Sequence, residues 1–214
     1  MKRIGILGTG EVGKALARGF IGIGYDVMIG TRDPNAEKSK AIKQTIPEIQ
    51  IGTFADAAQF GELVALCTLW SGTEAVLHAA GAKNLAGKVV IDVTNPLVFA
   101  SNQPPSLALG HTDSGGEQVQ RWLPDAKVVK AFNIVGSTDM VNPDFPGGPP
   151  DMFIGGNDAD AKATVTEILT QFKWNIVDLG GIEASRLLEP LCILWVVYGI
   201  RTGGWRHAFK MLKK

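Results

Sequence analysis

The sequence predicts an α/β fold, with a Rossmann-type, doubly wound and mostly parallel sheet and helices packed against it. Three observations favour this fold. Apolar runs alternate with helix-compatible segments along the chain, which is the pattern of repeated strand–helix–strand units. The run at 63–69 is almost continuously apolar, as is typical of a parallel strand buried on both faces. A glycine-rich turn at 8–13 directly follows the first apolar run, in the position where nucleotide-binding folds carry one.

The composition limits the class of protein. The 214 residues fit one large domain or two small ones, and 45% hydrophobic with 20% charged residues is ordinary for a globular chain. Lysine plus arginine equals aspartate plus glutamate at 21 each, so nothing favours a nucleic-acid partner. The longest apolar run, 191–200, is well short of the roughly 20 residues of a membrane-spanning helix. Cys67 and Cys192 lie in separate apolar runs, and we expect reduced thiols in the core of a cytoplasmic protein without membrane partners.

The opening stretch, residues 1–32, predicts a dinucleotide site. An apolar strand at 4–7 precedes the glycine turn, a helix at 14–21 follows it, and a second strand at 27–29 closes on Gly30-Thr31-Arg32. The turn itself consists of Gly8, Thr9, Gly10, Glu11, Val12 and Gly13. This order of strand, turn, helix and strand is the context that makes a G-x-G-x-x-G motif informative.

Each glycine of the turn has its own expected role. Gly8 permits the tight turn, Gly10 lets a pyrophosphate approach the backbone, and Gly13 lets the helix pack close to the strand. The pyrophosphate then lies on the N-terminal amides of the helix, where the helix dipole favours negative charge. A glycine-rich turn that binds no ligand is the less favoured alternative.

The end of the second strand indicates which dinucleotide binds. An NAD site usually carries an acidic residue there to hold the ribose 2′-hydroxyl, but this chain has Thr31 and Arg32. A hydroxyl and a guanidinium suit a 2′-phosphate, and we therefore expect NADP(H). Asp33 could be the missing acid, but we place it one turn past the strand. Lys38 and Lys40 are possible further phosphate partners, although a solvent-exposed helix face explains them better.

The middle of the chain predicts further strands whose carboxyl ends face the dinucleotide. The expected elements are a helix at 36–44, a short strand at 53–56 leading into a helix cap, a strand at 63–69, a helix at 75–80 and a strand at 88–93. Ligands in open α/β sheets bind beyond the carboxyl ends of the strands. The loops 69–73 and 94–98 should therefore face the dinucleotide.

The last part of the chain predicts an extension of the same sheet. Segment 100–116 is irregular, and either a lid or a surface loop is possible there. A helix at 117–123, a strand at 127–132 and a turn-dense segment at 142–150 follow. A βαβα pattern closes the chain, with strands at 152–155 and 175–179 and helices at 159–172 and 183–198. We therefore expect a single domain, 1–214, with a dinucleotide-binding core at about 1–134 and a C-terminal extension at about 151–214 that completes the substrate pocket and a dimer surface.

The familiar catalytic patterns are missing from the sequence. The three histidines have no metal-ligand spacing with each other or with the cysteines, so we expect no metal. There is no G-x-S-x-G elbow, and neither tyrosine is followed four residues later by the lysine that short-chain dehydrogenases use. No catalytic side chain is therefore predicted. This pattern suits a hydride acceptor that is itself a cofactor, because ring-to-ring transfer mainly needs positioning and exclusion of water.

Several phrases together resemble the coenzyme F420-dependent NADP oxidoreductases. They are the glycine turn 8–13, Gly30-Thr31-Arg32, Asn95-Pro96-Leu97, Lys130-Ala131-Phe132-Asn133 and Ser185-Arg186-Leu187-Leu188-Glu189. The same module is similar to the cytosolic NADPH-binding domain of the six-transmembrane metalloreductases. The resemblance covers nearly the whole chain and implies a cytoplasmic homodimer that transfers hydride between NADP(H) and the deazaflavin F420.

The resemblance also implies roles for individual residues. It places Thr9, Gly10, Glu11 and Val12 on the pyrophosphate, Thr31 and Arg32 on the 2′-phosphate, and Leu69 and Trp70 beside the ribose and nicotinamide. The pocket where hydride passes is implied to include Asn95, Pro96, Leu97, Asn133 and Ile134. Archaeal members carry His-Thr where Asn133-Ile134 stand here. Reduction of a flavin, or of a ferric chelate through a flavin, therefore stays open, as does a non-catalytic NADP(H)-sensing module.

The C-terminal aromatic residues have two possible roles. Trp195, Tyr198 and Trp205 could form a wall against a planar ring, or they could be core and dimer-interface packing. We favour packing for Trp195 and Tyr198 and leave Trp205 open. The phrase Trp205-Arg206-His207 could meet a polyanionic coenzyme tail, or could be a solvated helix end.

Overall fold

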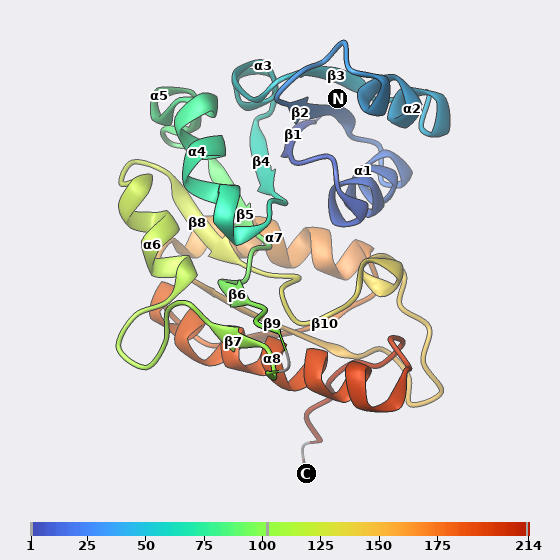
Figure 1. The fold of residues 1–214 in the computed structure, drawn as a ribbon, viewed down its shortest axis with the longest axis vertical. Coiled ribbons are helices and arrows are strands. Elements are labelled where there is room, and N and C mark those ends of the chain that lie inside the picture. Colours follow the sequence, from blue (N-terminus) through green and yellow to red (C-terminus); the bar gives the residue numbers. More distant parts are fainter. Residues whose placement is uncertain (1, 102, 213) are drawn as a thin grey trace.

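The computed structural model describes residues 2–101, 103–212 and 214, so residues 1, 102 and 213 of the expected domain lie outside it. Within the described residues, eight strands form one sheet in the order β10-β9-β8-β5-β4-β1-β2-β3 (Figure 1). The strands β1, β2, β3, β4, β5 and β8 are mutually parallel neighbours. This confirms the predicted Rossmann-type, mostly parallel sheet.

The first half of the sheet carries the glycine turn. Its elements are β1 (Arg3–Leu7), α1 (Glu11–Gly22), β2 (Asp26–Thr31), α2 (Glu37–Thr45), β3 (Gln50–Thr53), α3 (Phe54–Phe60) and β4 (Leu63–Leu66). The strand predicted at 53–56 is wrong, because Thr53 ends β3 and caps α3. The Thr53 hydroxyl accepts from the Asp56 amide at 3.1 Å, and the Asp56 carboxylate accepts from the Thr53 amide at 2.8 Å. This reciprocal capping box makes Thr53 the N-cap residue, and helix α3 begins at Phe54.

The second half of the sheet contains one difference that affects the site. Its elements are α4 (Trp70–Ala80), α5 (Ala82–Leu85), β5 (Val89–Asp92), β6 (Leu97–Val98), β7 (Ser106–Leu107), α6 (Gly115–Trp122) and β8 (Lys127–Lys130). Residues 70–73, expected in a loop, form the first turn of α4. The segment expected to be irregular at 100–116 instead contains β7, which pairs antiparallel with β6, and the start of α6. It is therefore partly an ordered hairpin arm.

The C-terminal segment extends the same sheet, as predicted, but with reversed direction. It consists of a short 3₁₀ turn (Ser137–Asp139), β9 (Asp151–Gly156), α7 (Ala159–Gln171), β10 (Asn175–Asp178), a second 3₁₀ turn (Ile182–Ala184) and α8 (Ser185–Thr202). β9 runs antiparallel to β8, and β10 runs parallel to β9. In Figure 1, α8 lies at the opposite end of the molecule from α2 and α3, with the β6–β7 hairpin in front of the sheet.

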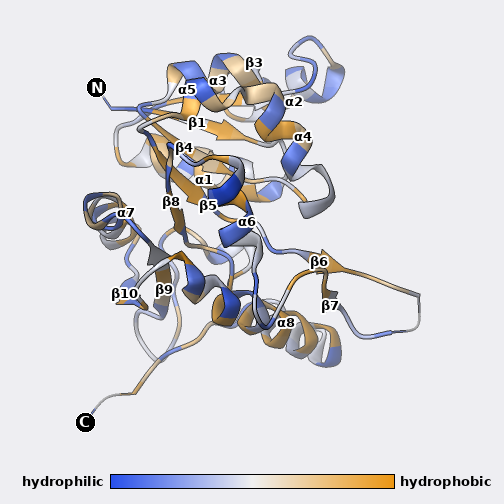
Figure 2. Cartoon of the chain, turned by 90° about the vertical axis from the view of Figure 1, so that its left-hand side faces the viewer, coloured by the Kyte–Doolittle hydropathy of each residue, from blue (hydrophilic) through white to orange (hydrophobic). Residues whose placement is uncertain are grey.

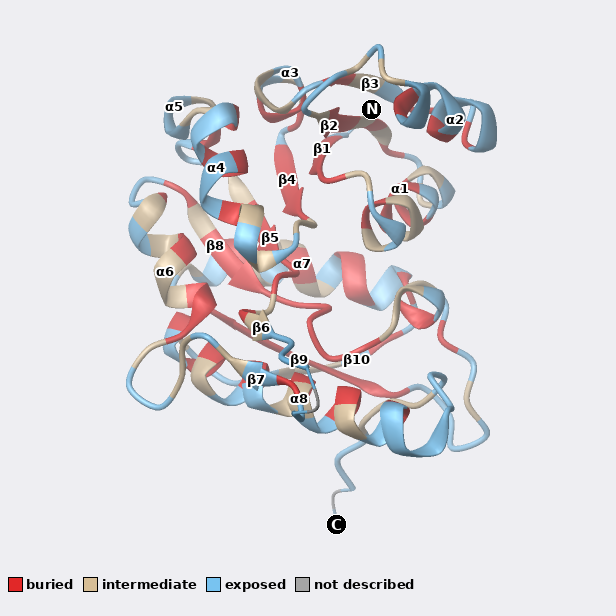
Figure 3. Ribbon diagram, viewed as in Figure 1, coloured by how far each residue is buried: buried red, intermediate tan, exposed pale blue. Residues whose placement is uncertain are grey.

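Two apolar layers enclose the sheet, one on each face. Along β4, Leu63 and Ala65 belong to the larger cluster, which includes Phe20 and Phe172, whereas Val64 and Leu66 belong to the smaller one. Figure 2 shows the central strands β1, β4 and β5 as predominantly hydrophobic, and Figure 3 shows them as mostly buried, whereas the edge strands β3 and β10 are partly exposed. The continuous apolar run that predicted this strand is therefore explained by burial on both faces. Among the described helices, none combines the length and the apolar character needed to cross a bilayer.

Candidate functional site

The glycine turn leaves open space only where a ligand would need it. Gly8 has a φ of +136°, and a Cβ on it would overlap the carbonyl oxygen of Cys67. A Cβ on Gly13 would overlap the carbonyl oxygen of Gly8, so both glycines are required by the packing of the turn itself. A Cβ on Gly10, by contrast, would meet no atom within 4 Å. Gly10 therefore borders an open cradle, which fits the close approach of a pyrophosphate.

The N-terminus of α1 opens onto this cradle. Gly10 is the N-cap residue, and among the residues that the structure describes it provides no side-chain cap for the first turn of the helix. Glu11 points its carboxylate at the Lys14 ammonium, 2.5 Å away. The Lys14 ammonium lowers the pKa of Glu11, with smaller effects from Arg18 and Lys38. Thr9 is half-buried, and Val12 packs against the larger core cluster. The helix start thus offers uncapped amides in basic surroundings, which suits a phosphate group.

Arg32 and Asp33 differ in how far the protein already uses their side chains. The Asp33 carboxylate accepts a hydrogen bond from the Asn35 amide at 2.9 Å, and the Asp33 carbonyl oxygen accepts from the Ser39 hydroxyl at 2.8 Å. Asp33 thereby shapes the turn that leads into α2. Arg32 is exposed, and within residues 2–101, 103–212 and 214 its guanidinium forms no ion pair. Arg32, at the end of β2 beside Thr31, is the side chain left to meet an anion.

Leu69 and Trp70, which follow β4 at the start of α4, have different surroundings. Leu69 is 84% exposed at the start of α4, two residues beyond the Cys67 carbonyl that abuts Gly8. The indole of Trp70 instead stacks on Trp122 of α6, with ring centroids 5.5 Å apart. The structure therefore leaves Leu69 open to a ligand at this edge of the sheet. Trp70 is half-buried and supports α6 through this stacking.

Asn95 and Asn133, predicted to share a pocket, are in direct contact. The Asn95 side-chain nitrogen donates to the Asn133 backbone carbonyl oxygen at 2.8 Å, and the Asn133 side-chain nitrogen donates to Asn95 Oδ1 at 3.0 Å. The Asn133 nitrogen also donates to the Leu188 carbonyl oxygen of α8 at 2.9 Å. Among the described residues, Asn133 Oδ1 is buried without a donor. The pair therefore joins the turns after β5 and β8 and retains one unused acceptor.

The other residues predicted for this pocket are mostly structural. Pro96 is buried, and its carbonyl oxygen accepts from the Ala108 amide at 2.7 Å. Leu97 lies in β6 opposite Leu107 and packs against the small cluster formed by Cys192, Trp195 and Val196. Ile134 is 2% exposed within the larger core cluster. These side chains pack against the protein itself, and Asn95 is the more exposed polar group beside them.

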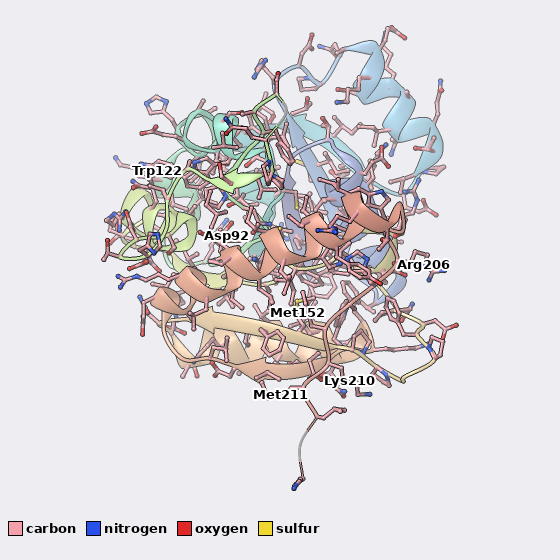
Figure 4. The ribbon with its side chains drawn as sticks, turned by 60° about the horizontal axis from the view of Figure 1, so that its bottom comes forward. Asp92, Trp122, Met152, Arg206, Lys210 and Met211 are labelled. Carbon is pink, nitrogen blue, oxygen red and sulfur yellow. The ribbon has the colours of Figure 1, made fainter. Side chains whose placement is uncertain are left out.

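The sequence prediction missed a buried charged cluster at the same edge of the sheet. Lys130, at the end of β8, is fully buried, and its Nζ lies 2.7 Å from Asp92 Oδ2 and 2.9 Å from Glu189 Oε1. We call Asp92, Lys130 and Glu189 the buried triad; Figure 4 shows Asp92 in the interior beside α8. Burial alone would lower the pKa of Lys130, but the two carboxylates outweigh burial and raise this pKa. The sequence feature that could have indicated the triad is that Asp92, Lys130 and Glu189 are charged residues within or beside apolar runs.

The C-terminal tail differs from both of the predicted interpretations. Helix α8 ends at Thr202, and the Arg206 guanidinium pairs with the buried Asp139 carboxylate at 2.7 Å (Figure 4). Trp195 is buried, as expected, and its indole nitrogen donates to the His207 carbonyl oxygen at 2.7 Å. Tyr198 is 55% exposed, and Trp205 packs against Trp195 with ring centroids 5.5 Å apart. These contacts hold the C-terminal tail against the rest of the protein. The charge of Arg206 is already balanced by Asp139.

The cysteines and the possible metal-ligating side chains are further features of the described chain. Within it, no group of three or more histidine, cysteine, aspartate or glutamate side chains could hold a metal ion. Both cysteine thiols are free. Burial raises the pKa of Cys192 to about 12 and raises the pKa of Cys67 further. Neither thiol is therefore a ready nucleophile at neutral pH.

Comparison with known proteins gives consistent results. The model of the family described as NADP oxidoreductase, coenzyme F420-dependent, matches residues 3–96. The crystal structure of a candidate F420-dependent NADP reductase from Arthrobacter sp. FB24 is 39% identical, with a TM-score of 0.93 over 100% of both chains. The F420-dependent NADP reductase of Methanothermobacter marburgensis is 28% identical over 93% of both chains.

A second group of relatives consists of longer proteins. Metalloreductase STEAP3 of Rattus norvegicus is 28% identical over 193 residues, which cover 88% of this chain and 36% of the relative. This chain thus spans about a third of the length of the metalloreductases that it matches.

Proposed function

This chain belongs to the coenzyme F420-dependent NADP oxidoreductase family and is an NADP-dependent oxidoreductase, and we propose that it transfers hydride directly between NADP(H) and a deazaflavin. When bound, the nicotinamide supplies or accepts the hydride at its ring. The protein contributes binding, alignment and exclusion of water. We propose that residues 1–134 form the dinucleotide-binding core and that 151–214 complete the pocket.

We assign the phosphates to the glycine turn and the end of β2, and call this region the phosphate end. The open space beside Gly10 and the uncapped amides of α1 support a pyrophosphate held by Thr9, Gly10, Glu11 and Val12. The exposed guanidinium of Arg32, which forms no ion pair with the described part of the chain, lies next to Thr31 and supports a bidentate contact with the 2′-phosphate. Asp33 is already used by its own turn. The open cradle and the free Arg32 side chain together are the observation that carries the proposal.

We assign the redox rings to the region around Leu69, Trp70, the 95–97 turn and Asn133, and call this region the nicotinamide end. These residues follow the carboxyl ends of β4, β5 and β8, where ligands of open α/β sheets bind. The 84% exposed Leu69 offers apolar surface to a flat ring. The half-buried Asn95 side chain lies at the same strand ends and suits the polar carboxamide of a nicotinamide. Reduction of a deazaflavin by NADPH also takes up one proton, which bulk water can supply, so the proposal requires no proton-donating side chain among those described.

A direct assay distinguishes the proposed acceptor from its alternatives. The purified protein is mixed with NADPH and either F420 or FMN, and loss of the reduced nicotinamide absorbance is followed. Turnover with F420 supports the proposal. Turnover with FMN alone indicates a flavin reductase, or a ferric-chelate reductase when an iron chelate is present, as the metalloreductase relatives suggest. Tight NADPH binding with no turnover of either acceptor indicates a non-catalytic NADP(H) sensor.

We further propose that the protein is a cytoplasmic homodimer that associates through α8. Leu187, Leu194 and Tyr198 lie at spacings of seven and four residues and are 68%, 58% and 55% exposed, so one face of the helix carries a continuous apolar stripe. The free thiols fit a reducing compartment. Sedimentation analysis should give a dimer mass for the natural chain and a monomer mass for Leu194→Glu. A monomeric natural chain would refute this proposal.

A further inference from the structure

Lys130 is a fully buried lysine whose contacts all lie beside the nicotinamide end. We propose that Lys130 is a positioning residue that fixes the nicotinamide end of the site. It does so through Asp92, Glu189 and the Thr94 carbonyl oxygen, without touching the cofactor. This inference rests on the proposed function and names the groups that hold that part of the site in place. Its evidence is a set of contacts joining three segments far apart in sequence.

Each charge in the triad has partners, so the cluster can persist without solvent. Glu189 accepts hydrogen bonds from the Gly115 and Gly116 amides, each at 2.9 Å, at the N-terminus of α6. That helix end favours a carboxylate and balances one of the two negative charges. Lys130 lies between Glu189 and Asp92 and balances the other. Buried ion pairs are costly unless such additional hydrogen bonds satisfy them, so this arrangement has a defined geometry.

The triad holds the residue that begins the 94–97 turn on three sides. Asp92 Oδ1 accepts from the Thr94 amide at 2.9 Å and from the Thr94 hydroxyl at 2.7 Å. The Lys130 ammonium donates to the Thr94 carbonyl oxygen at 2.8 Å. Thr94 is thus fixed at its amide, hydroxyl and carbonyl. The next residue along the chain is Asn95, which pairs with Asn133.

The same cluster also places α8 against this turn. Glu189 is anchored to Lys130, and its neighbour Leu188 presents its carbonyl oxygen to the Asn133 side chain at 2.9 Å. The turn after β5, the turn after β8 and α8 are therefore joined through one ammonium group. Within the described residues, no hydrogen bond or ion pair of the triad reaches the glycine turn or Arg32. The positioning effect should therefore fall on the nicotinamide end and leave the phosphate end unchanged.

Two ligands separate the two ends of the site. The probe 2′,5′-ADP carries the adenosine and the 2′-phosphate but no nicotinamide, whereas NADP⁺ carries both. The test variant is the double substitution Lys130→Met with Asp92→Asn, which removes one charge of each sign and leaves Glu189 on the α6 amides. Isothermal calorimetry should show the Kd of 2′,5′-ADP unchanged within about twofold and the Kd of NADP⁺ raised about tenfold.

Controls distinguish positioning from a general loss of structure. The matched control is Lys162→Met with Asp178→Asn, which removes a lysine–aspartate pair of 2.8 Å between α7 and β10; it should bind both probes as the natural chain does. If the test variant does not fold, Thr94→Val removes only the hydroxyl contact with Asp92 and should raise the Kd of NADP⁺ about threefold, with 2′,5′-ADP unchanged.

The outcomes are separable. Equal weakening of both probes, or no change in a folded variant, would overturn the positioning role of Lys130. A natural chain that binds neither probe would instead overturn the proposed function itself.

Discussion

The phosphate end and the nicotinamide end of the proposed site are built from different materials. The phosphate end consists of backbone amides, a glycine beside open space and the exposed Arg32. At the nicotinamide end, Asn133 is already bonded to Asn95, and the buried triad beside it is held by the pairing of Lys130 with Asp92. The first region has polar groups that are available to a ligand. In the second, most polar groups already form hydrogen bonds or ion pairs within the protein, and we call this part the supporting frame.

The difference teaches which substitutions act on binding and which act on folding. A change at the phosphate end removes a contact that only a ligand makes, so the folded protein should tolerate it. A change in the buried triad leaves a charge buried without its partner, so it should lower the free energy of unfolding. The predictions below test this division.

The largest expected effect is the loss of Lys130 alone. Lys130→Met leaves the Asp92 and Glu189 carboxylates buried without their shared cation, and we expect the free energy of unfolding to fall by about 3–5 kcal/mol. Urea denaturation measures it. Lys162→Met removes a more exposed ion pair and should cost less than about 1 kcal/mol. If the two variants were equally stable, the buried triad would not stabilise the fold more than an exposed ion pair does, and this prediction would be wrong.

The second expected effect concerns coenzyme choice at the phosphate end. Arg32→Asp should lower the ratio of kcat/KM for NADPH to that for NADH by about 10- to 100-fold, because a carboxylate repels the 2′-phosphate that the guanidinium would bind. The free energy of unfolding should hardly change, since Arg32 is exposed. Asp33→Ala is the control. If Asp33 held the adenosine ribose, this control would weaken NADH binding, and the assignment of Arg32 would be wrong.

The same contrast explains what the sequence could predict. The strand–turn–helix of residues 1–32 is local, so its glycines and apolar periodicity were sufficient to predict β1, α1 and β2. The pairing of Lys130 with Glu189 joins a strand to a distant helix, and no local pattern records such a contact. Strand 53–56 was wrong because Thr53 both ends β3 and caps α3. The β6–β7 hairpin was missed because strands of two residues carry no periodicity.

The third expected effect separates the glycines of the turn. Gly10→Ala should weaken NADP⁺ binding at least about tenfold, because its methyl group projects into the space reserved for the pyrophosphate. Its stability should be retained, since Gly10 has a φ of −77° and its Cβ meets no protein atom. Gly13→Ala should instead destabilise the protein, because its Cβ overlaps the Gly8 carbonyl oxygen. Calorimetry should show weaker NADP⁺ binding for Gly10→Ala, and thermal unfolding should show lower stability for Gly13→Ala. A Gly13→Ala variant as stable as the natural chain would contradict this prediction.

The smallest expected effect concerns an ion pair at the edge of the frame. Arg186 of α8 donates to the Glu117 carboxylate of α6 at 2.8 Å, and this hydrogen bond keeps the pKa of Glu117 below its ordinary value of 4.5. A lowered folded-state pKa contributes stability above pH 4.5, and the contribution disappears as the pH falls through the folded pKa.

Arg186→Gln should therefore lower the free energy of unfolding by at most about 1 kcal/mol at neutral pH, because the pair is partly exposed. In strong acid, where Glu117 is protonated in both proteins, the variant and the natural chain should be equally stable. Thermal unfolding across this pH range would reveal the convergence. A difference that persisted in acid would show that Arg186 stabilises the α6–α8 contact by packing rather than by charge. The ionic part of the frame would then be confined to the buried triad.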